Sequence, residues 1–186
     1  ENLRILLFLE LSKTEKVIEM YGQQMFDLLL ENTGLRIQEE LRASDYVFRF
    51  EGNQFAILLS HVKDRLDAGK VATKLHEKVT FPYKFKGNDL SVGCSIGSAV
   101  FPYDGQSKEE LIQKATSAML ESKRNEEKFV LYDPSTHSKA VNRLELEGCA
   151  YRDLEEKQFQ LYFQPIVDRS YRIVGAEALI RWYHPE

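Results

Sequence analysis

The stretch YVFRFEGNQFAILL, from Tyr46 to Leu59, decides how this chain folds. Its aromatic residues recur at every second position, Tyr46, Phe48 and Phe50, which predicts a strand whose aromatic face is buried. The pair Gly52-Asn53 predicts a two-residue type II′ turn, and the apolar run after it predicts a strand covered on both faces. Because polar residues flank the turn, we expect the functional site at this edge of the sheet.

The composition indicates a globular protein. The chain has 186 residues, of which 43% are hydrophobic and 29% charged, and its net charge is −4. We therefore expect one or two folded domains and no nucleic-acid partner. No apolar run approaches ~18 residues, no signal-peptide pattern is present, and two cysteines make no disulfide framework. These features predict a soluble cytoplasmic fragment of a longer protein. An upstream membrane anchor in the full-length protein is compatible with this prediction.

The segments around the hairpin predict a sheet covered by helices. Arg4 to Leu11 is nearly all apolar, which predicts a central strand, and Ser12-x-x-Glu15 predicts a capping box at the start of a helix that Gly22 interrupts. Apolar spacing and turn residues predict further helices at 26–41, 68–79 and 111–122, the last capped by Ser107-x-x-Glu110, and strands at 81–85, 90–101 and 129–132. The order β-α-α-β-β-α-β-β-α-β favours an α+β fold with a mixed, largely antiparallel sheet over a doubly wound parallel sheet.

Small residues line one side of the strand at 90–101. Gly93 and Gly97 alternate with large residues there, so either a helix or a ligand approaches the backbone closely. Close helix packing is the favoured alternative.

The composition of the sequence changes after Asp133-Pro134. Residues 139–157 are charged with apolar residues at helical spacing, which predicts a connecting helix. Two strands, 159–167 and 173–182, joined by a turn at Asp168, open a second domain. We therefore divide the chain into 1–134, 135–157 and 158–186.

The motifs resemble a GGDEF domain followed by the start of an EAL domain, the bacterial modules that make and degrade cyclic di-GMP. The family hairpin R-x-G-G-D-E-F is matched by Arg49-Phe50-Glu51-Gly52-Asn53-Gln54-Phe55, and F-x-D-x-D-x-F-K by Phe8 to Glu15. The EAL start is matched by YFQPIV at 162–167 and EALIRW at 177–182. The resemblance implies a nucleotide-cyclase palm-like, ferredoxin-like core, then the truncated start of a (β/α) barrel.

The hairpin departs from the family where a cyclase needs charge. Diguanylate cyclases bind GTP through divalent metals held by carboxylates, and Mg²⁺ prefers anionic oxygen ligands. Here both hairpin carboxylates are amides, Asn53 and Gln54, and Glu51 replaces a glycine. Glu10 alone keeps a metal-capable group, so the resemblance implies a degenerate motif without cyclase activity.

The GTP-binding positions of the family are partly kept. Asp27 matches the family aspartate that reads guanine, whereas Ile18 stands at the matching asparagine. Lys123 is kept, but Glu127 stands where the family has a phosphate-facing arginine. These residues predict a vestigial GTP site with weak affinity.

Arg42-Ala43-Ser44-Asp45 matches the R-x-x-D inhibitory site of the family. An arginine fork can hold phosphate and an aspartate can accept from guanine, so Arg42 and Asp45 are candidates to bind cyclic di-GMP. The alternative is a local Arg–Asp pair at a helix end.

In the EAL start, the resemblance makes Glu177 a metal ligand of the catalytic site, and Arg181 and Gln164 ligand-binding residues. Glu177 and Arg181 lie four apart on a strand and therefore share a face; the alternative is an ion pair between them. The full-length EAL domain would use Mg²⁺ or Mn²⁺. No cofactor is expected in this fragment, because barrels of this class need ~250 residues.

Two functions follow as hypotheses. In the first, a catalytically inactive GGDEF module regulates an EAL phosphodiesterase that hydrolyses cyclic di-GMP. In the second, the protein is a non-catalytic cyclic di-GMP receptor or scaffold. The open edges of strands 159–167 and 173–182 predict packing on the first domain or exchange in a homodimer.

Overall fold

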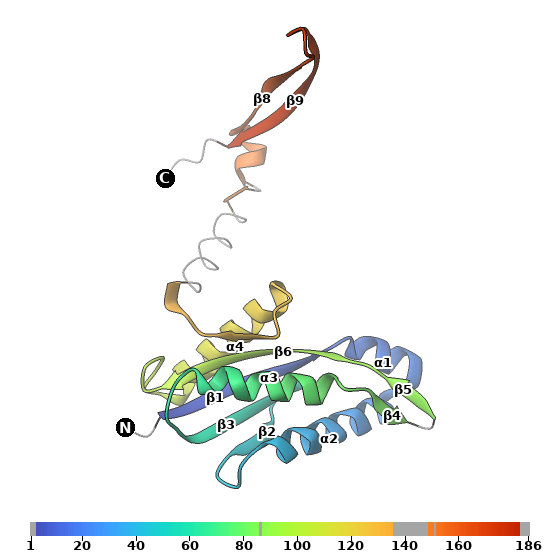
Figure 1. Ribbon diagram of the computed structural model, residues 1–186, viewed down its shortest axis with the longest axis vertical. Coiled ribbons are helices and arrows are strands. Elements are labelled where there is room, and N and C mark those ends of the chain that lie inside the picture. The colour runs from blue at the N-terminus through green and yellow to red at the C-terminus, as the bar shows by residue number, and fades with distance from the viewer. Residues whose placement is uncertain (1–2, 86, 136–148, 151, 183–186) are drawn as a thin grey trace. The chain divides into compact units, whose positions relative to one another are not determined.

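The computed structural model describes residues 3–85, 87–135, 149–150 and 152–182 (Figure 1). The chain forms two compact units, Glu1–His137 and Ser138–Glu186, which we describe separately. Within the described residues, no helix has the length and apolarity needed to cross a membrane.

The first unit is built on a five-stranded sheet in the order β2-β3-β1-β6-β7. Only the β6–β7 pair is parallel, so the predicted mixed, largely antiparallel sheet is confirmed. The apolar strand predicted to be central is β1, which pairs with β3 on one side and β6 on the other. The strands are β1 (Leu3–Ser12), β2 (Tyr46–Arg49), β3 (Gln54–Val62), β6 (Gly93–Phe101) and β7 (Phe129–Leu131), with a separate β4–β5 ribbon (Tyr83–Phe85 and Asn88–Leu90).

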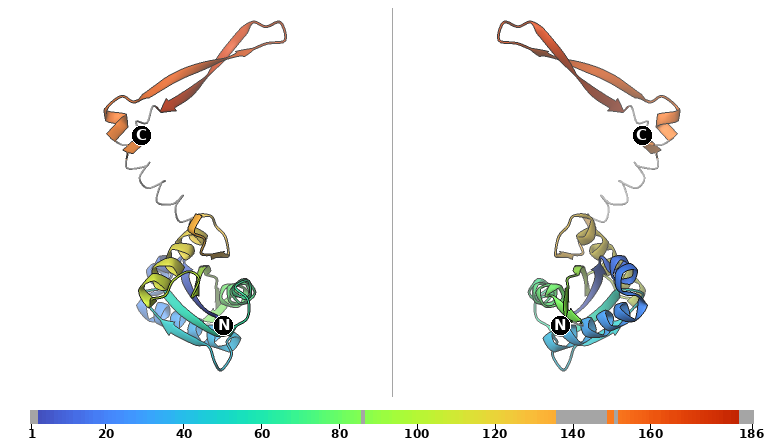
Figure 2. Two further views of the ribbon diagram at one scale, coloured as in Figure 1. Left: turned by 90° about the vertical axis from the view of Figure 1, so that its left-hand side faces the viewer. Right: turned by 90° about the vertical axis from the view of Figure 1, so that its right-hand side faces the viewer.

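Helices cover both faces of this sheet, as Figure 2 shows for α3 and α4. Helices α1 (Thr14–Tyr21), α2 (Gln23–Glu40) and α3 (Asp67–Thr80) lie on one side, and α4 (Lys108–Arg124) lies on the other. Alternate residues of β1 divide between two cores: Ile5, Leu7 and Leu9 pack in the larger core, and Phe8 packs under α4. Each fully buried side chain of this size contributes about 1.5–3 kcal/mol to folding.

The small face of β6 serves helix packing. A Cβ added at Gly97 would lie 1.9 Å from the backbone nitrogen of Met119 in α4. The favoured alternative of the sequence is therefore confirmed at Gly97, and this contact fixes α4, which carries Lys123, against the sheet. At Gly93 an added Cβ would lie 2.5 Å from the hydroxyl of Ser12.

The two predicted capping boxes have different outcomes. Ser107 accepts a hydrogen bond from the backbone N–H of Glu110 at 3.2 Å and caps α4 as predicted. The prediction at Ser12 is wrong, because Ser12 is still paired in β1 and α1 begins after Lys13, whose φ is 64°. The chain leaves the strand through this left-handed residue, so no side chain caps α1.

The prediction that the aromatic face of β2 is buried is also wrong. Tyr46 and Phe48 are each 54% exposed and Phe50 is 45% exposed, whereas Val47 packs against the larger core. The reason lies in the packing, since β2 is an edge strand whose Val47 side faces α2, while α4 lies over β1 and β6. Alternation fixed which residues share a face but not which face is covered.

The turn lies at Gly52-Asn53 as predicted, but the loop is one residue longer than the predicted two-residue form. The N–H of Gln54 donates to the carbonyl of Glu51 at 2.8 Å, and Gly52 has the positive φ of 51° that a glycine-first turn requires. The N–H of Phe50 donates to the carbonyl of Gln54, so three residues separate these paired positions.

The second unit is an antiparallel hairpin of β8 (Phe159–Val167) and β9 (Ile173–Trp182), as predicted. Asp168 organises its turn by accepting from the N–H groups of Ser170 and Arg172. Residues 152–155 are helical, and most of the predicted connecting helix lies outside the described residues. The division of the chain into 1–134, 135–157 and 158–186 stays a prediction.

Candidate functional site

The hairpin tip holds a closed cluster of side chains around Glu10. Gln54 donates its amide N–H to Oε2 of Glu10 at 2.7 Å, and Nζ of Lys123 donates to Oε1 at 2.6 Å. The three residues come from β3, β1 and α4, and register places Gln54 directly opposite Glu10. Glu10 is buried, whereas the Lys123 side chain is 54% exposed. The hydrogen bond and charge of Glu10 raise the pKa of Lys123, so the ammonium stays charged.

Asn53 ties the tip to the end of β1. Its side-chain amide donates to the backbone carbonyl of Leu11 at 2.5 Å and to the Thr14 hydroxyl at 3.3 Å. Its backbone carbonyl accepts from the backbone N–H of Leu11 at 3.1 Å. Asn53 and Gln54 therefore both use their N–H groups as donors at this site.

This donor set does not fit the divalent ion of a cyclase. A metal needs several oxygen ligands with free lone pairs, and here one carboxylate is already bound on each oxygen by an N–H donor. Among the described residues, no three Asp, Glu, His or Cys side chains converge in a metal-binding arrangement. Glu10, the metal-capable residue expected from the sequence, is hydrogen-bonded to Gln54 and ion-paired with Lys123.

The positions predicted for a vestigial GTP site, Asp27 and Lys123, line two separate cavities. Asp27 lines a cavity of about 460 Å³ between α2 and the hairpin, together with Gly34, Arg49 and Phe55, and accepts a hydrogen bond from Gln23 at 3.1 Å. Lys123 lines another cavity of about 490 Å³. The structure does not bring Asp27 and Lys123 into one cavity, and Ile18 lines neither.

The second of these cavities has little net positive charge. Glu126 and Glu127 line it beside Lys13, Lys123 and Lys128. His76 adds no charge at neutral pH, because burial and the nearby Lys128 lower its pKa. A triphosphate would therefore meet two carboxylates, and one of the three lysines is already paired with Glu10.

Arg42 and Asp45 line a cavity of about 500 Å³ between β3 and α3. Asp45 has a structural role there, since its carboxylate accepts from the N–H of Ser60 at 2.9 Å and from the N–H of Arg42 at 3.1 Å. No contact between the Arg42 guanidinium and Asp45 is present, so the alternative of a side-chain ion pair is not what the geometry shows.

Sequence reasoning missed three lysines in this cavity. Lys63, Lys70 and Lys74 join Arg42 on its wall, and Lys70 is paired with Asp67 at 2.8 Å. The lysines follow Arg42 by more than twenty positions and have no motif of their own, so only the packing of α3 beside β3 reveals the cluster.

The second unit aligns its polar residues on one face of the β8–β9 hairpin. Gln164 pairs with Glu177, and Gln160 pairs with Arg181, so these four side chains share a face. The prediction that Glu177 and Arg181 share a face is confirmed, and the structure adds Gln160. Glu177 is exposed, and Arg181 donates to the carbonyl of Ile180 at 3.0 Å, so the two form no ion pair. Glu177 is the one carboxylate on this face among the described residues.

Comparisons with known proteins match two family models to different parts of the chain. The model of the family "Diguanylate cyclase, GGDEF domain" matches residues 1–128, and that of the EAL domain matches residues 149–186. The bifunctional diguanylate cyclase/cyclic di-GMP phosphodiesterase MucR of Pseudomonas aeruginosa is 32% identical over 182 residues, which are 97% of this chain and 26% of MucR. The cyclic di-GMP phosphodiesterase NbdA of the same species is 31% identical over 96% of this chain and 23% of NbdA. The chain thus spans about a quarter of the length of these relatives.

Solved structures show the same fold. An EAL/GGDEF domain protein from M. capsulatus has a TM-score of 0.67 and 33% identity, covering 72% of this chain and 86% of that chain. The GGDEF domain of YfiN from Pseudomonas aeruginosa has a TM-score of 0.67 and 28% identity over 72% of this chain and 83% of its own. This chain therefore belongs to the GGDEF domain family of GGDEF–EAL cyclic di-GMP signalling proteins, and its sequence continues into the start of an EAL domain.

Proposed function

We propose that the first unit is a GGDEF domain without cyclase activity that regulates the EAL domain of the same protein. The observation that carries this proposal is the carboxylate of Glu10, which is bound by Gln54 and Lys123 where a cyclase would bind its metal. Phosphoryl transfer depends on positioning and charge neutralisation, and removal of one oxyanion donor alone costs about 3 kcal/mol. Losing both hairpin carboxylates removes more than that.

In the complete protein, the EAL domain hydrolyses cyclic di-GMP with Mg²⁺ or Mn²⁺. Glu177 supplies a hard oxygen ligand of the kind these ions prefer, and Gln164 lies directly opposite it. Arg181 shares this face and supplies the guanidinium that holds a ligand phosphate in this proposal. The names of MucR and NbdA, both cyclic di-GMP phosphodiesterases, support this proposal. We place the protein in the cytoplasm, where its nucleotides are found.

Two assays test the proposal. The 186-residue chain, incubated with GTP and Mg²⁺ or Mn²⁺, is expected to yield no cyclic di-GMP. The complete protein is expected to hydrolyse cyclic di-GMP, and Glu177→Ala is expected to abolish that hydrolysis. Cyclic di-GMP formation by the chain that disappears with a chelator would overturn the first statement, and hydrolysis unaffected by Glu177→Ala would overturn the second.

The second candidate function is a cyclic di-GMP receptor. The cavity around Arg42 favours it. Four cations, Arg42, Lys63, Lys70 and Lys74, line it against the carboxylates of Glu40, Asp45 and Asp67, and all of these cations except Lys70 form no ion pair among those found in the described residues. Calorimetric titration of the chain with cyclic di-GMP and with GTP separates an effector site at Arg42 from the vestigial site at Asp27. Arg42→Ala is expected to remove cyclic di-GMP binding and leave the weak GTP heat unchanged.

If the complete protein binds cyclic di-GMP but hydrolyses none, the receptor function replaces the regulatory one. A homodimer through exchanged hairpin strands is compatible with both.

A further inference from the structure

A buried carboxylate in the second unit joins the helical residues 152–155 to the end of β9. Asp153 is 1% exposed and accepts a hydrogen bond from the indole N–H of Trp182 at 2.9 Å. The Trp182 ring also stacks on Phe159, with ring centroids 5.2 Å apart. Phe159 opens β8 and Trp182 closes β9, so the three residues gather at the base of the hairpin.

The backbone of Asp153 fixes the start of β8 as well. Its carbonyl accepts from the N–H of Gln158 at 2.9 Å, around a left-handed Lys157 whose φ is 59°. This is the bond pattern that ends a helix and redirects the chain. Asp153 therefore contacts Gln158, the residue immediately before β8, through its backbone and Trp182, the last residue of β9, through its side chain.

An acid at this position is not explained by packing alone. A buried polar group is unfavourable unless it is hydrogen-bonded, and here the indole N–H of Trp182 donates that bond. The neighbouring Arg152 lies 3.6 Å from Oδ1 of Asp153 but its side chain is 62% exposed, so it adds little. The carboxylate is thus suited to the directional bond with Trp182.

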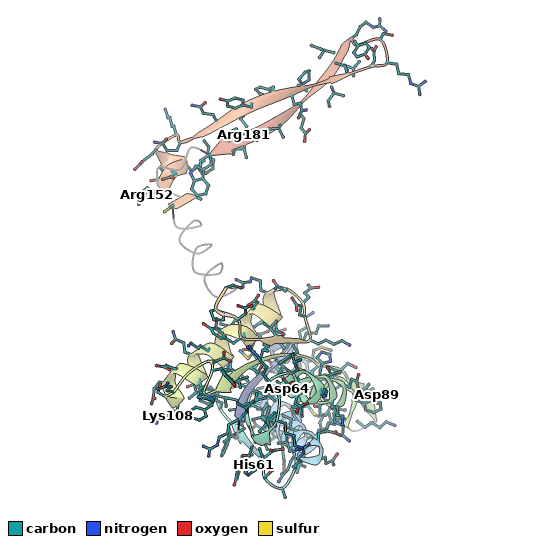
Figure 3. The ribbon with its side chains drawn as sticks, turned by 60° about the vertical axis from the view of Figure 1, so that its left-hand side comes forward. His61, Asp64, Asp89, Lys108, Arg152 and Arg181 are labelled. Atoms are coloured by element: carbon teal, nitrogen blue, oxygen red, sulfur yellow. The ribbon has the colours of Figure 1, made fainter. Side chains whose placement is uncertain are left out.

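Trp182 is the direct neighbour of Arg181, which Figure 3 labels near the end of β9. Successive strand residues point to opposite faces, so the ring of Trp182 anchors one face while Arg181 projects from the other. Arg181 shares its face with Glu177 and Gln164. Fixing the ring fixes the backbone from which the guanidinium extends.

We propose that Asp153 is a positioning residue for Arg181: through its bond to Trp182 it holds the end of β9 in the place where Arg181 meets a phosphate of cyclic di-GMP. The same bond couples the end of β9 to the helical residues 152–155 that precede β8. This inference rests on the proposed function of the EAL domain.

The bond itself is tested by fluorescence of the 186-residue chain, in which Trp182 is the only tryptophan. Asp153→Leu is expected to shift the Trp182 emission to longer wavelength and to increase its quenching by iodide. Asp153→Asn keeps an oxygen acceptor and is expected to retain the wild-type spectrum. Identical spectra for wild type and Asp153→Leu would overturn the proposal.

The positioning role is tested by kinetics of the complete protein. Asp153→Leu is expected to raise KM for cyclic di-GMP about tenfold, the effect of losing one hydrogen bond to a charged group, with kcat nearly unchanged. Asp153→Asn is expected to restore KM, and Trp182→Phe combined with Asp153→Leu is expected to be no worse than Asp153→Leu alone. A shifted Trp182 spectrum with unchanged KM would mean a purely structural bond and would overturn the proposal.

The outcome stays distinguishable from failure of the proposed function. If the complete protein binds but does not hydrolyse cyclic di-GMP, the same tenfold change is expected in the Kd from calorimetry. A Kd that Asp153→Leu leaves unchanged overturns the proposal even then.

Discussion

The hairpin tip of the first unit and the polar face of β8–β9 use similar residues in opposite ways. At the tip, Glu10 receives an amide N–H and an ammonium, so its charge is neutralised within the protein. On the β8–β9 face, Glu177 is exposed and Arg181 bonds only to the adjacent carbonyl among the contacts found for it. The first arrangement stabilises a fold, and the second leaves charged groups available for a ligand.

The amides of the tip explain how its side chains bind one another. Replacing a carboxylate by an amide keeps one acceptor oxygen and adds an NH2 donor. The donor then binds the remaining carboxylate, and the charge repulsion that a metal would have relieved disappears. Under the function that we propose, the loss of the metal site and the closure of the cluster have the same cause.

The largest expected effect concerns the glycines of the two units. Gly97→Ala would force a Cβ within 1.9 Å of the α4 backbone, and we expect a loss of about 3 kcal/mol or more in the free energy of unfolding. Gly175→Ala on β9 is the matched control, because its Cβ would lie 3.8 Å from Ile166, an ordinary contact. Urea unfolding monitored by circular dichroism measures both, and equal stabilities would contradict the close packing of α4.

A second change reopens the tip. Gln54→Glu places a second carboxylate beside Glu10, where the Gln54 amide nitrogen now lies 2.7 Å from Oε2 of Glu10. We expect a loss of about 2 kcal/mol in the free energy of unfolding at neutral pH. Repulsion raises the pKa of the pair above its unfolded value, so the loss is absent below about pH 4 and grows as pH rises. Thermal melting with and without Mg²⁺ is expected to show partial recovery by the ion.

Gln54→Leu is the control for this change, since it removes the donor without adding charge. Its melting temperature is expected to be insensitive to Mg²⁺. The account of the tip fails if Gln54→Glu is as stable as Gln54→Leu at neutral pH.

A third prediction concerns the apolar face of the second unit. Leu161, Phe163 and Ile180 are 62%, 66% and 61% exposed there, and open strands seek partners. Phe163→Glu is expected to weaken self-association of the chain about tenfold, about 1.4 kcal/mol, as measured by light scattering. Gln160→Glu on the opposite face is the control. A strictly monomeric chain whose β8 and β9 are readily cut by protease would argue against packing or exchange.

The smallest expected effect belongs to Lys123. Its side chain is 54% exposed, so solvent screening limits the contribution of the ion pair to below about 1 kcal/mol. The pKa of Lys123 is raised by Glu10, so this stabilisation is full below the ordinary value of 10.5 and is lost as pH rises through the folded value. Melting curves of wild type and Lys123→Gln are expected to differ at pH 8 and converge above about pH 11. A difference that persists there would indicate a role other than the charge.

Most of the fold could be predicted from the sequence, because strand alternation and helix spacing are local patterns. The break at Gly22 and the cap at Ser107 were correct, and the order of elements was correct except that the predicted strand 90–101 is two strands, β5 (Asn88–Leu90) and β6 (Gly93–Phe101). The errors fell where a neighbour decides the outcome. Ser12 has the right residue type for a cap but is still paired with Gly93, and Tyr46 and Phe48 share the sheet face that α4 covers but lie on the edge strand, beyond the strands under α4.

The candidate sites divide in the same way. Motif spacing identified Glu10, Gln54, Lys123, Glu177 and Arg181, and strand period placed the last two on one face. It could not reveal the lysines beside Arg42 or the bond between Asp153 and Trp182, because these residues are distant in sequence and carry no motif.

By itself the sequence determined which chemical groups this protein has: amides in place of the hairpin carboxylates, and an intact EALIRW segment. Those properties belong to the side chains and do not depend on their surroundings. Only the tertiary structure decided what the groups do with one another. In the folded chain Gln54 and Lys123 donate to Glu10, the carboxylate of Asp45 accepts from backbone N–H groups, and Glu177 is exposed. The tertiary structure decides this because the partners of a charged group are set by proximity in space.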